Sequence, residues 1–173
     1  MSITDNQKEV LAAMGVALIM LQAAEKLIRL CLTFVIQKSD SLTLDLLIDQ
    51  EEAERKKTLG YFLTELHKRA DIHEEFDALL SDFLKNRNDF VHDLSRVQNW
   101  DLSSSGDASE AKRFIDKLIW QTDRVMKVFS GLIMLWQDQS GISKTPIPSH
   151  DWFLEVESDY KPAMQYLFNA KST

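Results

Sequence analysis

Two side chains near the middle of the chain have types and spacing that suit chemistry on a phosphate. Arg87 carries a guanidinium, whose planar fork of N–H donors matches phosphate oxygens. His92 carries an imidazole, which titrates near neutral pH and can act as a general acid or base. Asn88 follows the arginine and lies four residues before the histidine. The sequence therefore places a phosphate-binding fork and a titratable base close together.

A helix is expected to position these residues. Its apolar residues recur at spacings of four and three, which is typical of a core-facing stripe: Phe76, Leu80, Phe83, Phe90 and Leu94. Arg87 takes the place in that stripe between Phe83 and Phe90, so a cation is expected to interrupt the apolar face. Asn88 and His92 are expected to lie one above the other on a neighbouring stripe.

Helical periodicity dominates the whole chain. It predicts helices over about 5–37, 52–70, 71–95 and 110–139, with Asp71 as the N-cap of the third and a loop over 98–109. A tail with Pro146 and Pro148 follows, and Pro162 is expected to open a short helix. We therefore predict an all-α fold, a four- to five-helix up-down bundle over 1–141, with a C-terminal extension over 142–173 that packs on it.

Composition narrows the class of protein. At 173 residues the chain is expected to form one domain. The single cysteine, Cys31, excludes an internal disulfide, and the first residues lack a secretory signal, so we expect a cytoplasmic protein. The net charge of -7 argues against a broad electrostatic hold on nucleic acid. The longest uncharged run, Val10 to Ala24, falls short of the ~20 residues that cross a bilayer, so no membrane span is expected.

Most catalytic signatures are missing from the sequence. The five glycines, at positions 15, 60, 106, 131 and 141, form neither a dinucleotide fingerprint nor a phosphate loop. There is no CxxC, HExxH or GxSxG. We therefore expect neither a metal nor a cofactor, and the candidate site rests on Arg87, Asn88 and His92.

An all-α bundle with such a motif resembles the HEPN superfamily, whose members carry R-x(4 to 6)-H with a polar residue after the arginine. The motif here is Arg87-Asn88-Asp89-Phe90-Val91-His92, and the resemblance covers about 5–139. It implies metal-independent cleavage of RNA by attack of the 2'-hydroxyl on the adjacent phosphorus. His92 would act as general acid/base, Arg87 would hold the phosphate, and Asn88 would orient the histidine or the phosphate. The resemblance thus implies a ribonuclease of the toxin–antitoxin or phage-defence type, with an antitoxin or another protein as partner.

A homodimer is expected on two grounds. Five residues of ideal helix put Arg87 and His92 about 140° apart, so a second protomer or a break in the helix would have to bring them together. The family resemblance implies the second protomer. In addition, the first helix carries two adjoining apolar stripes. A single neighbouring helix in a small bundle does not cover both stripes. A charge at Ala17 or Met20 is expected to disrupt the dimer.

Two alternatives remain open. Asp89 and Asp93 add negative charge that would repel a phosphate backbone, which favours a non-catalytic HEPN module that binds RNA or a protein. In a purely structural alternative, Arg87 pairs with a carboxylate such as Glu25, and His92 caps a helix end. Leu94 stands where toxins controlled by a partner nucleotidyltransferase carry a modifiable tyrosine, so that form of control is expected to be absent.

Overall fold

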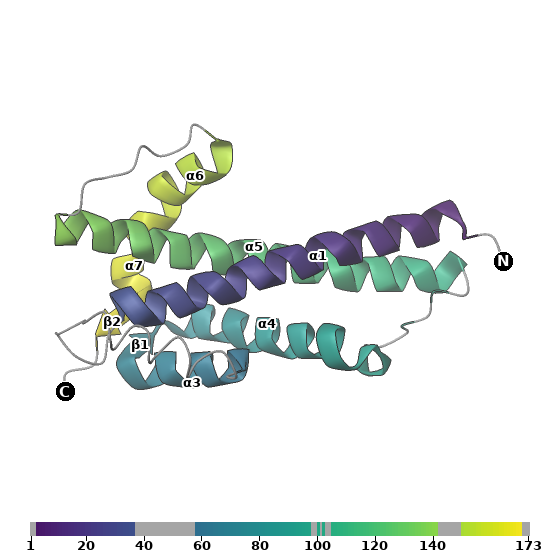
Figure 1. Cartoon of the computed structure of the whole chain (residues 1–173), viewed down its shortest axis with the longest axis horizontal. Helices are drawn as coiled ribbons and strands as arrows, with labels where there is room; N and C mark the ends of the chain where they lie inside the picture. The colour runs from purple at the N-terminus through teal and green to yellow at the C-terminus, as the bar shows by residue number, and fades with distance from the viewer. Residues whose placement is uncertain are drawn as a thin grey trace. The chain divides into compact units, whose positions relative to one another are not determined.

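The protein is all-α, as predicted. The computed structural model describes residues 3–36, 58–97, 100, 102, 105–141 and 150–170. Helices make up nearly all of these ranges, and the strands found there are two segments of three residues each (Figure 1). The predicted helical bundle class is therefore confirmed.

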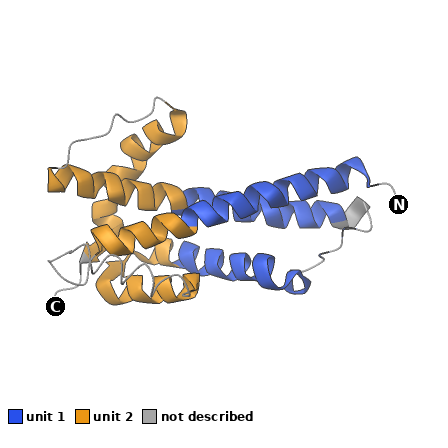
Figure 2. Ribbon diagram, viewed as in Figure 1, with its two compact units in different colours: residues 1–24, 78–125 blue, residues 25–77, 126–173 orange. Residues whose placement is uncertain are grey.

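The chain divides into two compact units (Figure 2). Unit 1 consists of residues 1–24 and 78–125, and unit 2 consists of residues 25–77 and 126–173. The helices α1 (Asp5–Leu30), α4 (Glu74–His92) and α5 (Ser105–Ser140) each contribute residues to both units. The predicted division into a bundle over 1–141 and an extension over 142–173 stays a prediction.

Unit 1 is built from the first part of α1 and parts of α4 and α5. Thr4 and Gln7 form a capping box at the start of α1, since the Thr4 hydroxyl accepts from the Gln7 amide and the Gln7 side chain accepts from the Thr4 amide. Thr4 is therefore the N-cap of α1. The core of the unit is aliphatic and aromatic, with Val10, Ala17, Leu21, Leu80, Phe83, Phe90, Ala111, Ile115 and Leu118 buried.

Unit 2 contains α3 (Leu59–Arg69) and a small sheet. The antiparallel strands are β1 (Ala70–Ile72) and β2 (Phe168–Ala170), with Ile72 opposite Phe168. The expected helix start at Asp71 is wrong, because Asp71 lies in β1. Instead, the His73 carbonyl accepts from the Phe76 and Asp77 amides at the start of α4.

The C-terminal segment packs into the core of unit 2. It contains α6 (Asp151–Glu155), a π-helical turn (Val156–Tyr160) and α7 (Lys161–Leu167), with Pro162 in the first turn of α7, close to the expected start. Val156 and Met164 are buried, and Lys127 of α5 pairs with Glu155 at 2.8 Å. Pro146 and Pro148 lie outside the described residues. The segment is thus tied to unit 2 by both apolar and ionic contacts.

Two helix ends differ from the expectation. α1 is followed by a π-helical turn (Cys31–Val35), in which the Cys31 thiol donates to the Phe129 carbonyl at 3.4 Å and burial raises the pKa of the thiol. α5 begins at Ser105, so the expected loop over 98–109 is wrong for its last residues.

The C-terminal end of α5 is followed by Gly141. This residue has a φ of 64°, a left-handed conformation that favours glycine and ends a helix.

α1 exposes an apolar, uncharged face. Among its larger exposed residues are Leu11, Val16, Leu18 and Ile19, and Ile19 is 69% exposed. The helical run Asp5–Val35 is long and apolar enough to cross a membrane by length and composition, and 22% of its most apolar window is buried in the chain. Mostly buried core helices of soluble proteins and signal sequences near an N-terminus pass the same test. The expectation of no membrane span stays a prediction.

Candidate functional site

The helix labelled α4 in Figure 1 runs from Glu74 to His92. All three predicted site residues therefore lie near its C-terminal end. Glu74, Glu75 and Asp77 fill its first turn, where negative charge is favoured by the helix dipole. Leu80, Phe83 and Phe90 are buried as predicted. The motif thus lies on a helix that a packed face holds in place.

The buried residue between Phe83 and Phe90 is Asn86, not Arg87. Asn86 is 9% exposed and its amide donates to the Gln121 side chain of α5 at 2.8 Å; Gln121 is 1% exposed. Arg87 is half-buried instead. The expectation that a cation interrupts the core face is therefore wrong, because a satisfied amide pair fills that place and fixes α4 against α5.

The three predicted residues come together in one chain. Arg87 Nη1 donates to Asn88 Oδ1 at 3.0 Å and to His92 Nε2 at 3.1 Å. His92 is exposed at the end of the helix. The arrangement therefore presents a guanidinium and an imidazole side by side at a solvent-accessible position.

This geometry corrects the expected gap between the arginine and the histidine. α4 runs without a break from Glu74 to His92, so the backbone positions of Arg87 and His92 keep their helical separation. The long arginine side chain spans that separation within one protomer. Neither a second protomer nor a helix break is needed for the contact. This angle therefore does not require a dimer, and the homodimer stays a prediction.

Asn88 contacts the arginine and not the histidine ring. The Asn88 side-chain oxygen accepts a hydrogen bond from Arg87 Nη1. In the described part of the chain, this is the one hydrogen bond that the Asn88 side chain makes. Asn88 and His92 share a helix face, as expected, but the guanidinium lies between them. Asn88 is thus placed to orient Arg87.

A tight turn follows the site. Asp93 caps a 3-10 turn (Leu94–Arg96), accepting from the Ser95 amide at 3.2 Å and from Arg96 Nε at 3.0 Å. The hydrogen bond from the Ser95 hydroxyl, with smaller contributions from Arg96, lowers the pKa of the Asp93 carboxyl. Arg96 offsets part of the negative charge of Asp93, which the sequence alone counted against phosphate binding.

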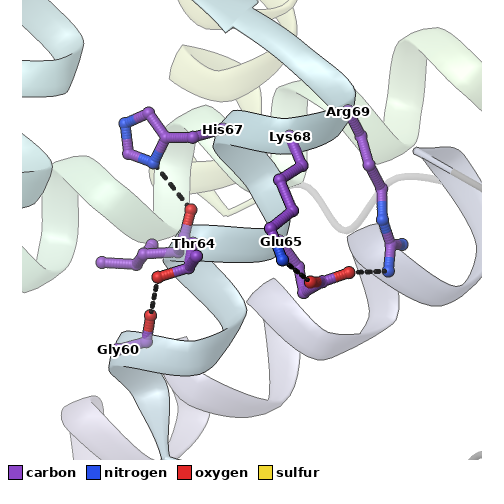
Figure 3. Close-up of polar contacts among 7 residues, drawn as sticks. Gly60, Thr64, Glu65, His67, Lys68 and Arg69 are labelled. Carbon is purple, nitrogen blue, oxygen red and sulfur yellow. Dashed lines mark hydrogen bonds and ion pairs between the residues drawn. The ribbon is translucent and has the colours of Figure 1, made fainter. Parts of the chain in front are cut away.

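A second polar cluster, on α3, was not predicted. His67 Nδ1 lies 2.7 Å from the Leu63 carbonyl, and His67 Nε2 lies 2.6 Å from Asp77 Oδ1 of α4 (Figure 3 shows the first contact). The sequence analysis gave His67 no role. Its partner Asp77 lies ten residues later on another helix, so no local sequence pattern around His67 predicts the contact.

Glu65 lies at the centre of this cluster. It is buried and pairs with Lys68 at 2.9 Å and Arg69 at 3.1 Å (Figure 3). The Glu65 hydrogen bond raises the pKa of Lys68. Arg69 Nη1 also donates to the carbonyls of Leu32 and Ile36. Because these contacts satisfy helix ends and a buried carboxylate, the cluster reads as structural.

No metal site is found among the residues that the structure describes, since no three His, Cys, Asp or Glu side chains gather there. Comparison with protein-family models, curated proteins and solved structures gives no match to the chain. The geometry of Arg87, Asn88 and His92 therefore carries the functional argument.

Proposed function

We propose that the chain is a metal-independent endoribonuclease of the HEPN toxin or defence type that acts in the cytoplasm. The observation that supports this is the contact of Arg87 Nη1 with His92 Nε2 at 3.1 Å on the exposed end of α4. A guanidinium binds phosphate oxygens and offsets charge in the transition state, and an imidazole moves a proton. Asn88 is a positioning residue that orients the guanidinium.

The proposed reaction uses the RNA's own 2'-hydroxyl. His92 Nε2 takes the proton of that hydroxyl as its oxygen attacks the adjacent phosphorus, and the bond from phosphorus to the 5'-oxygen breaks. The products are a 2',3'-cyclic phosphate and a 5'-hydroxyl. The leaving oxygen needs a proton, which a His92 of a second protomer would supply. The reaction thus favours a homodimer.

The test is cleavage of single-stranded RNA in the presence of EDTA. We expect cyclic phosphate ends, and a loss of about 10²- to 10⁴-fold in rate for His92→Ala and a comparable loss for Arg87→Ala. Arg113→Ala and His150→Ala are matched controls, because both residues are exposed and lie in other elements. Cleavage that requires Mg²⁺, or that survives both site variants, would contradict the proposal.

Stability separates this function from the structural alternative. If Arg87 serves catalysis, Arg87→Ala should lower the free energy of unfolding by no more than about 1.5 kcal/mol, the net contribution of a hydrogen bond. If it serves a buried ion pair with a carboxylate such as Glu25, the loss should be about 3 to 5 kcal/mol. Urea unfolding of the two proteins, with Glu25→Gln as a third, distinguishes the cases.

The proposed dimer forms through the exposed face of α1. Leu11, Val16, Leu18 and Ile19 offer an uncharged apolar surface that a second copy would cover. Ala17 is 0% exposed, so a charge there would disrupt the core of the chain itself, and Ile19→Glu is the better test. Light scattering should show a dimer that Ile19→Glu dissociates and that Ser109→Glu, an exposed change on α5, leaves intact. A stable monomer of the unmodified chain would contradict the dimer.

A second candidate function is a non-catalytic HEPN module that binds RNA or a protein partner such as an antitoxin. The half-buried Asp89, directly after Asn88, is the observation that favours it, because its negative charge opposes that of a phosphate. RNA binding that depends on Arg87, with no cleavage by any preparation, would support the binding module over the enzyme.

A further inference from the structure

The motif is hydrogen-bonded to itself. Arg87 Nη1 carries two hydrogens, and it donates to Asn88 Oδ1 at 3.0 Å and to His92 Nε2 at 3.1 Å. Asn88 lies one residue away along the chain and His92 lies five residues away. Both hydrogens of this nitrogen are therefore used by the motif before any ligand arrives.

The contact also fixes the form of the His92 ring. A guanidinium donates and never accepts, so Nε2 must present its lone pair to Arg87. The ring is then neutral, with its proton on Nδ1. Among the residues that the structure describes, Arg87 is the one that forms a hydrogen bond with the His92 ring.

A histidine in this state cannot act as a base at Nε2, because the lone pair that must take the proton is engaged. A phosphodiester changes the balance. Hydrogen bonds from a guanidinium to an anionic phosphate oxygen are charge-assisted and about twice as strong as bonds to neutral acceptors. A bound phosphate therefore competes with the imidazole for this Arg87 nitrogen.

We propose that the motif rests in this self-paired form and that a bound phosphodiester opens it by drawing Arg87 away from His92. The inference rests on the proposed function and adds how the site is switched on. One N–H···N bond is broken and one N–H···O bond is formed. The freed Nε2 takes the proton of the 2'-hydroxyl during cleavage. When the ligand has no 2'-hydroxyl, it takes a proton from the acid form of the buffer, which is left as its conjugate base.

Arg87 is the charged group that the structure places in contact with His92 Nε2. Asp89 and Asp93 are the charged residues nearest to His92 in the sequence, and Asp93 is paired with Arg96. On α5, Lys117 pairs with Asp82 of α4, Lys112 with Asp116, and Arg113 with Glu110. The hydrogen bond from Arg87 is therefore the contact that the test below follows.

The test uses nitrogen NMR of the histidine rings in the full-length protein. Without ligand, His92 Nε2 should resonate as an unprotonated nitrogen that accepts a hydrogen bond. A 2'-deoxy dinucleotide, which carries a phosphodiester but cannot be cleaved, should shift that signal to the position of a protonated nitrogen. Inorganic phosphate tests whether a free phosphate ion has the same effect as the phosphodiester of the dinucleotide. Chloride at matched ionic strength controls for electrostatic screening. His73 and His150 serve as internal references.

Variants make the inference decisive. In Arg87→Ala the dinucleotide should leave the His92 signal unchanged, whereas Asn88→Ala should keep the response with weaker binding. A His92 Nε2 that is already protonated without ligand, or that stays unchanged in saturating dinucleotide, would overturn the exchange. RNA cleavage with an unchanged ring would reject the exchange and keep the enzyme. A ring that responds without any cleavage would keep the exchange and reject the enzyme.

Discussion

His67 and His92 are both exposed histidines on helices, yet their rings have opposite partners. His67 has an oxygen acceptor at each nitrogen, the Leu63 carbonyl at 2.7 Å and Asp77 Oδ1 at 2.6 Å. His92 has a donor at one nitrogen, Arg87 Nη1 at 3.1 Å. Only a doubly protonated ring donates at both nitrogens, and only an unprotonated nitrogen accepts from arginine.

The comparison separates a structural histidine from a candidate base. The Nδ1 atom of His67 contacts the Leu63 carbonyl within α3, and its Nε2 atom contacts Asp77 of α4. Both ring nitrogens are therefore engaged inside unit 2, and neither offers a lone pair to a substrate. His92 Nε2 keeps a lone pair, which Arg87 holds until the proposed exchange releases it, and the ring is exposed to solvent. Residue type and exposure are alike in the two regions, so the partner of the ring decides which one suits chemistry.

The strongest test of this comparison is a crossed pair of substitutions. We expect His92→Ala to lower RNA cleavage by about 10²- to 10⁴-fold and leave stability unchanged. We expect His67→Ala to leave cleavage unchanged and to lower the free energy of unfolding by less than about 1 kcal/mol, because its ion pair is partly exposed. Cleavage assays and urea unfolding measure the two effects.

The Cys31 thiol provides a local readout for the same variants. It is buried in unit 2, and burial raises its pKa, so the folded chain should react slowly with thiol reagents. Faster labelling is expected in His67→Ala and not in His92→Ala. Equal effects of the two variants on cleavage would contradict the distinction between the two histidines.

Most of the fold follows from the sequence because its helices are long and strongly periodic. Phe83 and Phe90 are buried where the spacing of apolar residues placed them, and Gly141 ends α5. The start of α4 was mispredicted, because the strand at Asp71 exists through pairing with Asn169, almost a hundred residues away. Local propensity carries no information about such a partner.

The site was predictable in its residues but not in its geometry. Arg87, Asn88 and His92 were identified from type and spacing, and they do meet. Their contact depends on the reach of a flexible side chain, which helix geometry alone does not describe. Asn86 was missed although it fits the core spacing, three residues after Phe83, because a polar residue in a stripe is normally excluded.

The next test concerns the buried support of the His92 region. Asn86→Leu leaves the Gln121 amide buried without its partner, which should cost about 1 to 3 kcal/mol of unfolding free energy. The double change Asn86→Leu with Gln121→Leu removes both polar groups and should restore most of that loss. Urea unfolding of the singles and the double gives the coupling. Additive effects would show that the amide pair does not fix α4 against α5.

The smallest expected effect concerns the turn directly after His92. The Ser95 hydroxyl, helped by Arg96, lowers the pKa of Asp93 in the folded chain. The stabilisation by this carboxylate is therefore present above the ordinary aspartate pKa, about 4, and is lost as the pH falls through the lowered folded value. A pH titration of the Ser95 amide by NMR should show the turn opening in acid, and Asp93→Asn should remove that titration. Because the turn is exposed, the signals of the buried Asn86 and Gln121 side-chain amides, which do not titrate, should not follow the same curve. If they did, the transition would be global unfolding rather than a local loss at the end of α4.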